Sequence, residues 1–263
     1  MRRPSSCVRI ARQASRERFS QQQILSVFHQ ICGAVSHLHH QRPPIAHRDL
    51  KLENVLHAGA GSFKLCDFGS CMECPMLLGA NNRAAVEEDI EKNTTQMYRA
   101  PEMVDLYSAS ALDEKVDVWA LGCILYTLAM VTHPFQDAGN LGILGAQYKA
   151  ADPSICGPGI VEVIGRLLVV DPTARLTIDE LEGCLIALYH CKPLPAPPAR
   201  GQTSAASGAG GGKWQPHSLG AVRRAHKPIK AQTLGSIDGN SAAARRMAAR
   251  VRRARLRATC ARC

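Results

Sequence analysis

The sequence predicts a mainly α-helical fold with one small β-hairpin. Apolar residues recur every three or four positions over several long segments, the pattern of a helix with one buried face. Only one region reads as short strands, at residues 55–57 and 63–66 around a turn at 58–62. A chain of 263 residues has room for one sizeable core and for less structured ends.

The first predicted helix covers residues 19–40. Ser20 and Gln23 have the spacing of a capping box at its start, and Pro43 with Pro44 stops it. Its apolar face consists of Ile24, Val27, Phe28, Ile31, Val35 and Leu38.

Three further helices are predicted at residues 115–131, 161–170 and 178–188. The first of them is nearly all apolar, which implies burial on all sides. Thr177 and Glu180 form a second capping box at the start of the last one. An acidic segment, residues 84–93, also favours a helix.

Composition divides the chain into three parts. Residues 1–18 are basic and aperiodic, residues 19–191 have globular patterning, and residues 192–263 pass from a Pro/Gly-rich linker into an Arg/Ala-rich tail. Residues 192–263 contain 15 of the chain's 32 Lys and Arg residues and one of its 22 acids. Residues 1–191 therefore hold 17 basic and 21 acidic residues. The net charge of +10 therefore belongs to the tail, which we expect to be disordered.

The charge of the tail indicates what kind of partner it binds, and the cysteines indicate the cellular compartment of the protein. The tail's charge suits an acidic membrane surface or a nucleic acid, although no aromatic residues lie between the arginines for base stacking. The 11 cysteines are scattered, and no apolar block follows the basic start to make a secretory signal, so reduced thiols in the cytoplasm are expected. The longest apolar run, residues 119–131, is shorter than the roughly 20 residues that cross a bilayer.

The segment IAHRDLKLENVL carries the chemistry, through Asp49, Lys51 and Asn54. An Asp in a tight loop accepts a hydroxyl proton, an Asn side-chain oxygen ligates Mg²⁺, and a Lys offsets charge on a transferring phosphate. A second acid, Asp67 in LCDFGS, follows the second predicted strand, and Gly69 behind it lets the backbone swing. This set suits the transfer of a phosphoryl group from a metal-bound nucleotide to a hydroxyl.

The ordered motifs HRDLKLEN, CDFG and YRAPE resemble the catalytic loop, the metal-binding motif and the end of the activation segment of protein kinases. The resemblance implies the C-terminal, large lobe of a protein-kinase-like fold over residues 19–191, with ATP and Mg²⁺ as cofactors. It implies that Asp49 is the catalytic base and that Lys51, as in serine/threonine kinases, contacts the γ-phosphate. Asn54 and Asp67 would be the metal ligands, Asp67 the principal one.

The resemblance also implies structural roles for five residues. His47 and Arg48 would brace the catalytic loop, and Asp117 of DVWALGC would cap it from the buried helix. Glu102 of YRAPE would form a buried ion pair with Arg175 of DPTARL. Arg48 is also expected to dock a phosphorylated activation loop.

Longer stretches match one branch of these kinases. KLCDFGS, VEEDIEKNTTQMYRAPEMVDLYS, DVWALGCILYTL and HPFQDAGNLGI resemble the numb-associated kinase family, nearest to its cyclin G-associated, auxilin-type members. Residues 84–93 resemble a helix that this family inserts into its activation segment. The family implies clathrin adaptors as substrates and a place on vesicles or membranes. Thr95 would lie in the substrate-side turn, and Ser70, Thr94 and Thr95 are the candidate activating phosphosites.

We expect the small, N-terminal lobe of a kinase to be missing. Only 18 residues precede the first predicted helix, and neither a Gly-rich phosphate loop nor a strand lysine lies among them. Two functions stay open: a serine/threonine kinase or the large lobe of one, and a non-catalytic module whose lobe docks partners while its tail binds membrane or nucleic acid. The sequence upstream of Met1 discriminates between them, because an in-frame Gly-rich loop and strand lysine would favour the enzyme.

The 263-residue chain by itself is expected to bind Mg-ATP weakly or not at all, and to show little turnover. The reason is that the small lobe supplies half of a kinase's nucleotide pocket. Isothermal titration calorimetry with Mg-ATP measures the affinity, and a micromolar dissociation constant would contradict the expectation.

Overall fold

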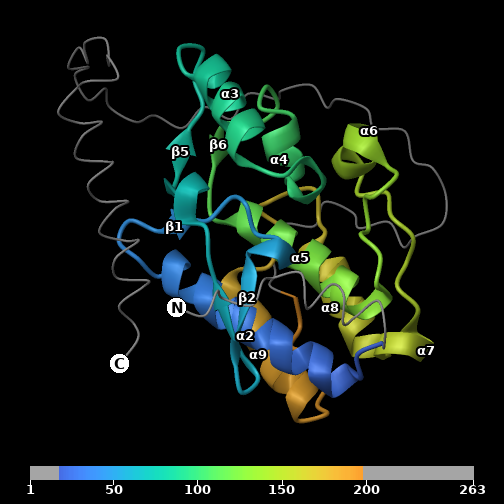
Figure 1. Cartoon of the computed structure of the whole chain (residues 1–263). Coiled ribbons are helices and arrows are strands. Elements are labelled where there is room, and N and C mark those ends of the chain that lie inside the picture. The colour runs from blue at the N-terminus through green and yellow to red at the C-terminus, as the bar shows by residue number, and fades with distance from the viewer. Residues whose placement is uncertain (1–17, 198–263) are drawn as a thin grey trace. The chain divides into compact units, whose positions relative to one another are not determined.

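The computed structural model describes residues 18–197 of the chain (Figure 1). The expected basic segment at the start, apart from Arg18, and the expected disordered tail from residue 198 onward lie outside the described residues. Within the described range the body is built mostly of helices, and its strands are short. The prediction of a mainly α-helical fold with a small hairpin is confirmed for this range.

The helices and strands have the following bounds. The helices are α2 (Gln21–His39), α3 (Arg83–Asn93), α4 (Pro101–Val104), α5 (Lys115–Met130), α6 (Gly139–Leu144), α7 (Pro153–Cys156), α8 (Pro158–Leu167) and α9 (Ile178–Tyr189). The strands are β1 (Ile45–Ala46), β2 (Val55–Gly59), β3 (Ser62–Leu65), β4 (Met72–Glu73), β5 (Met76–Leu77) and β6 (Ala111–Leu112). Short 3₁₀ turns lie at Leu52–Asn54, Phe68–Ser70 and Gln96–Tyr98. The described strands pair antiparallel, as β1–β4, β2–β3 and β5–β6.

Helix α2 begins at its predicted capping box. The Gln23 N–H donates to Ser20 Oγ at 3.3 Å, and the Ser20 N–H donates to Gln23 Oε1 at 2.9 Å. Behind the cap, the face that carries Ile24, Phe28 and Val35 is fully buried. It packs against α9, α5 and the hairpin strand β3, so the first helix anchors both the core and the hairpin.

The hairpin of β2 and β3 delivers the chain to the second acidic motif. Its turn is tighter than the sequence predicts, because Gly59 and Gly61 take φ values of 95° and 73°, which glycine adopts without a steric penalty. Gln30 of α2 binds the turn through both ends of its amide. Its Nε2 donates to the Gly61 carbonyl oxygen at 3.1 Å, and its Oε1 accepts the Phe63 N–H at 3.0 Å. The exit of the hairpin is thereby fixed relative to α2.

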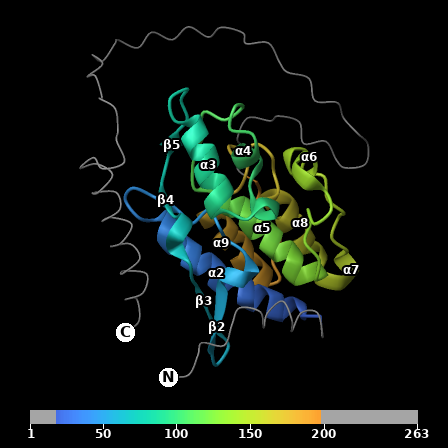
Figure 2. The same cartoon turned by 45° about the horizontal axis from the view of Figure 1, so that its top comes forward.

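Helix α5 forms the centre of the core (Figure 2). It packs against α2, α7 and α8. Trp119 on this helix is fully buried and stacks on Phe135, with ring centroids 5.3 Å apart. The predicted burial of this helix on all sides is confirmed. None of the helices between residues 18 and 197 combines the length and the apolar character that crossing a membrane requires.

Several short elements were not predictable from the sequence pattern. Strands β1, β4, β5 and β6 contain two residues each, too few for an alternating pattern to appear. Helix α8 begins at Pro158, ahead of the predicted residue 161, because proline is well tolerated in the first turn of a helix. It ends at Leu167 rather than at residue 170.

Packing continues past the predicted domain boundary at residue 191. Leu194 lies against the core, and Arg166 Nη1 of α8 donates to the Pro195 carbonyl oxygen at 2.6 Å. The proline-rich composition therefore marks the end of regular structure but not the end of contact with the body.

A buried ion pair ties α4 to the loop before α9, and it is the pair expected from the sequence. Arg175 is fully buried, and its Nη1 and Nη2 lie 2.8 and 3.0 Å from the two carboxylate oxygens of Glu102. The other guanidinium donors reach the carbonyl oxygens of Lys115, Val169 and Val170. All five N–H groups of the guanidinium are thus satisfied, which is the condition for tolerating a buried charge.

Replacing Glu102 with Gln is expected to lower the free energy of unfolding by about 3 kcal/mol, because Arg175 stays buried without a counter-charge. Urea denaturation measures the change. The matched control is Glu162→Gln, which removes an exposed pair with Arg166 one helical turn away and should change stability by no more than about 0.5 kcal/mol. Equal unfolding midpoints for the two variants would show that the buried pair has no special weight.

Candidate active site

The Asp49 loop, residues 47–54, is held by a buried carboxylate on α5. Asp117 Oδ2 accepts the backbone N–H of His47 at 2.7 Å, and its Oδ1 accepts that of Arg48 at 2.8 Å. His39 Nε2, at the end of α2, lies 3.0 Å from Asp117 Oδ2. Burial alone would raise the pKa of Asp117, but His39 and His47 outweigh burial and hold the pKa below its ordinary value. The charged carboxylate is therefore the form that caps the loop.

The turn that follows the hairpin is hydrogen-bonded to the Asp49 loop. His47 Nε2 lies 3.1 Å from the Cys66 carbonyl oxygen, and the His47 ring is 5.4 Å from the Phe68 ring. Ser70 Oγ donates to the His47 carbonyl oxygen at 2.6 Å, and Arg48 Nε donates to the Ser70 carbonyl oxygen at 2.5 Å. His47 and Arg48 thus brace two segments against each other.

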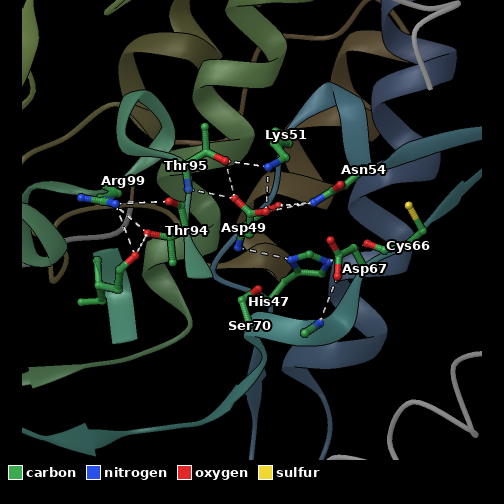
Figure 3. Close-up of polar contacts among 12 residues, drawn as sticks. His47, Asp49, Lys51, Asn54, Cys66, Asp67, Ser70, Thr94, Thr95 and Arg99 are labelled. Carbon is green, nitrogen blue, oxygen red and sulfur yellow. Dashed lines mark hydrogen bonds and ion pairs between the residues drawn. The ribbon is translucent and has the colours of Figure 1, made fainter. Parts of the chain in front are cut away.

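Donors surround the carboxylate of Asp49 (Figure 3). Its Oδ1 accepts the Thr95 backbone N–H at 2.9 Å and the Thr95 hydroxyl at 2.7 Å. Its Oδ2 lies 2.9 Å from Lys51 Nζ and accepts from Asn54 Nδ2 at 3.2 Å. Lys51 Nζ also donates to Thr95 Oγ1 at 2.6 Å. The carboxylate therefore holds a hydroxyl beside an ammonium group, an arrangement that can orient a hydroxyl nucleophile.

Asp49 and Asp67 line the same cavity, whose volume is about 310 Å³. The other residues of its lining are Lys51, Gly69, Ser70, Lys92, Asn93, Thr94 and Thr95. The structure thus brings together the two acids that the motifs separate by 18 positions. Asn54 is not part of the lining, but its hydrogen bonds to Asp49 place it directly beside the cavity.

The donor atoms at this cavity fit a hard cation such as Mg²⁺. Asp67 is exposed and, among the residues that the structure describes, accepts only the Gly69 N–H, at 3.4 Å. Asn54 directs its Nδ2 to the Asp49 carbonyl oxygen at 2.8 Å, which leaves Oδ1 as its ligand atom. Mg²⁺ takes such oxygen ligands and completes its octahedron with water and phosphate. Among residues 18–197 no three His, Cys, Asp or Glu side chains are grouped to hold an ion by themselves, so nucleotide phosphates would have to complete the site.

Residues 5–183 match the family model described as "Protein kinase domain". The chain belongs to this family. It is 47% identical over 165 residues to a probable serine/threonine-protein kinase of Dictyostelium discoideum and 41% identical over 185 residues to a second one from the same organism. It is 38% identical over 162 residues to Actin-regulating kinase 1 of Saccharomyces cerevisiae.

These matches cover 62%, 70% and 60% of this chain but only 20%, 16% and 25% of the respective relatives. The chain thus spans a quarter or less of the length of these curated relatives. The helix-rich architecture of residues 18–197, with its small sheets, is that of a protein kinase fold.

The activation segment of this kinase domain contains α3, which is fastened at two places. Arg48 Nη1 lies 2.7 Å from Asp89 Oδ2, where the Arg48 side chain is 5% exposed and that of Asp89 is 43% exposed. Arg99 secures the C-terminal end of the helix by donating to the carbonyl oxygens of Ile90 and Thr94 at 3.3 and 3.2 Å. Arg99 Nε also donates to Thr94 Oγ1 at 2.8 Å.

Two site residues lie in settings that the sequence does not predict. The expected partner of Arg48 is a phosphorylated residue, whereas the structure pairs it with the carboxylate of Asp89. Gly69 is expected to supply backbone freedom, yet the left-handed φ of 60° lies at Asp67, and Gly69 contributes its N–H to the Asp67 side chain. The sequence is also silent on His39, which stands among several histidines without a local pattern.

All three candidate phosphosites have hydroxyls that are hydrogen-bonded within the site. Ser70 Oγ donates to the His47 carbonyl oxygen, and Thr94 Oγ1 donates to the Ile90 carbonyl oxygen at 2.6 Å. The hydroxyl of Thr95 donates to the carboxylate of the Asp49 loop. Each hydroxyl would have to be released before it could be modified.

Replacing Asp89 with Asn is expected to loosen α3 by about 1–2 kcal/mol, because the nearly buried guanidinium of Arg48 loses the negative charge of its ion-pair partner. Hydrogen exchange followed by mass spectrometry should then show amides of residues 83–99 exchanging roughly five to thirty times faster. The matched control is Glu88→Gln, an exposed carboxylate of the same helix that makes no ion pair with the described residues. If both variants exchange at the same rate, the Arg48–Asp89 pair does not hold the helix.

Proposed function

We propose that this chain carries the catalytic lobe of a serine/threonine protein kinase, which transfers the γ-phosphoryl group of ATP to serine and threonine hydroxyls of proteins. The observation that carries the proposal is the hydroxyl held between Asp49 and Lys51: Thr95 Oγ1 lies 2.7 Å from Asp49 Oδ1 and 2.6 Å from Lys51 Nζ. This group faces a cavity that Asp67 also lines. The names of the two Dictyostelium relatives agree with this activity.

Each residue has a definite part in the proposed reaction. Asp49 accepts a hydrogen bond from the acceptor hydroxyl, aligns it and takes up its proton as the oxygen–phosphorus bond forms. Lys51 places positive charge beside the attacking oxygen, where the phosphoryl group arrives. Asn54 and Asp67 would hold Mg²⁺, which when bound supplies charge that neutralises the phosphate oxygens. Asp117 acts on geometry, because its contacts within the loop are to the backbone N–H groups of His47 and Arg48.

The reaction also needs a cover for the nucleotide, which we place outside residues 18–197. Within that range no Gly-rich loop and no strand lysine stand in a nucleotide-binding position, and the glycines of residues 57–63 form the hairpin turn. The chain covers only 16–25% of the relatives reported above, which leaves ample sequence for a small lobe in proteins of this kind. The described lobe would then be the half that binds metal and acceptor.

We further propose a place in the numb-associated branch, near its auxilin-type members, with clathrin adaptors or other vesicle-trafficking proteins as substrates. The support is the extended motif match and the position of α3, a helix inside the activation segment where that family inserts one. The work would take place in the cytoplasm or at vesicle surfaces, where a basic tail is attracted to acidic membrane or to nucleic acid. The yeast relative's name assigns that protein to actin regulation.

Replacing Asp49 with Asn is expected to lower the phosphorylation rate at least about 100-fold, because the amide cannot take up the hydroxyl proton. The measurement uses the complete gene product, expressed from its full-length transcript, with labelled ATP, Mg²⁺ and a protein panel that includes clathrin-adaptor subunits. Phosphoamino acid analysis should find phosphoserine and phosphothreonine.

The matched control is Asp152→Asn, at the N-cap of α7, where asparagine caps as well as aspartate. It should leave both the rate and the melting temperature unchanged. Equal labelling by wild type and Asp49→Asn would overturn the mechanism. Failure of the wild type to label any protein would instead favour the non-catalytic docking module.

A further inference from the structure

A second lysine lines the catalytic cavity. Lys92 lies in the last turn of α3 and shares the lining with Lys51 and the two aspartates. Its side chain makes no hydrogen bond or ion pair with any residue between 18 and 197. Glu88 stands one helical turn earlier on the same helix, and the two side chains do not pair.

The acids of the cavity leave Lys92 without a counter-charge. Asp49 already receives Lys51, Asn54 and both donors of Thr95. The carboxylate of Asp67 is the one suited to the metal of the proposed function. Lys92 is exposed, so its ammonium group is available to an anion that arrives with a ligand.

The backbone on both sides of Lys92 is fixed. Arg99 donates to the carbonyl oxygens of Ile90 and Thr94, and Arg48 holds Asp89 from the catalytic loop. The inner face of α3 is buried through Val86 and Ile90, which belong to the core and are 7% and 2% exposed. A lysine on such a fixed backbone can discriminate between ligands, because only its side chain has to be ordered on binding.

We propose that Lys92 determines substrate specificity by binding an acidic side chain of the protein substrate close to the residue that accepts the phosphate. The inference rests on the proposed kinase function, because it places the acceptor hydroxyl at Asp49. An extended peptide advances about 3.3 Å per residue. A carboxylate within about two positions of the acceptor therefore stays within reach of a lysine on the wall of the same cavity.

Two other uses of Lys92 make different predictions. A lysine in the last turn of a helix stabilises the helix dipole, and this use would show only in the order of α3. A lysine in this cavity also suits a nucleotide phosphate, and this use would show in the affinity for Mg-ATP. Lys51 already lies on the carboxylate of Asp49 and supplies the positive charge for the phosphate. We therefore assign Lys92 to the peptide substrate rather than to the nucleotide.

The test measures peptide binding, which does not depend on turnover. Two fluorescent peptides share a central serine and differ only in having Glu or Gln at the two positions on each side. Fluorescence anisotropy at low salt gives their affinities for the full chain, for Lys92→Gln and for Lys64→Gln. Lys64 is an exposed hairpin lysine outside the cavity and serves as the matched control. Because the basic tail attracts any acidic peptide, the decisive quantity is the change in the Glu/Gln affinity ratio.

Wild type and Lys64→Gln are expected to bind the Glu peptide more tightly than the Gln peptide. Lys92→Gln should reduce the Glu/Gln affinity ratio about fivefold, the effect of one partly exposed ion pair. The proposal is overturned if neither peptide binds, if the ratio in Lys92→Gln stays at the wild-type value, or if Lys64→Gln lowers it equally. It is likewise overturned if Lys92→Gln changes only the Mg-ATP affinity or only the hydrogen exchange of α3. Failure of phosphoryl transfer itself is read separately, from the labelling assay with Asp49→Asn.

Discussion

The carboxylate of Asp117 is the constraint on which the site depends. It is fully buried in the first turn of α5, and its two oxygens take the N–H groups of two consecutive residues, His47 and Arg48. Arg48 adopts a left-handed φ of 65°, which non-glycine residues rarely do, and the hydrogen bonds to Asp117 offset that strain. Each N–H left buried without this acceptor would cost about 1–3 kcal/mol. The direction in which Asp49 points is therefore set by a residue of the core helix.

Arg48 links the Asp49 loop, which Asp117 holds, to the rest of the site. Its backbone is held by α5, its Nε by the Ser70 carbonyl oxygen, and its Nη1 by Asp89 of α3. One side chain thus joins the central helix, the turn that carries the metal-binding aspartate of the proposed function, and the activation segment. The carboxylate of Asp89 lies where the sequence leads one to expect a phosphate, so the segment is ordered here by a side chain that is always present.

The sequence predicts those parts of the fold whose signals are local and complete. The capping boxes place the starts of α2 and α9, and the apolar run places α5. The order of the motifs is enough to bring Asp49 and Asp67 together. Contacts between distant residues are different: His39 meets a partner 78 positions away, and Asp89 is one of several similar acids on its helix. Nothing local distinguishes such residues, because their role arises only when separate elements pack together.

The hydrogen bonds that already fill the carboxylate of Asp49 bear on the order in which the nucleotide and the acceptor hydroxyl bind. Oδ1 accepts two donors from Thr95, and Oδ2 lies against Lys51 and Asn54, so the roughly four acceptor positions of a carboxylate are all taken. An incoming hydroxyl must displace one of them. Lys51 is the most mobile candidate, since its side chain is 23% exposed and its ammonium group is carried on a flexible four-carbon stem. A phosphate that draws the Lys51 ammonium group away would free Asp49 Oδ2. Binding of the nucleotide would then make this oxygen available to the acceptor hydroxyl.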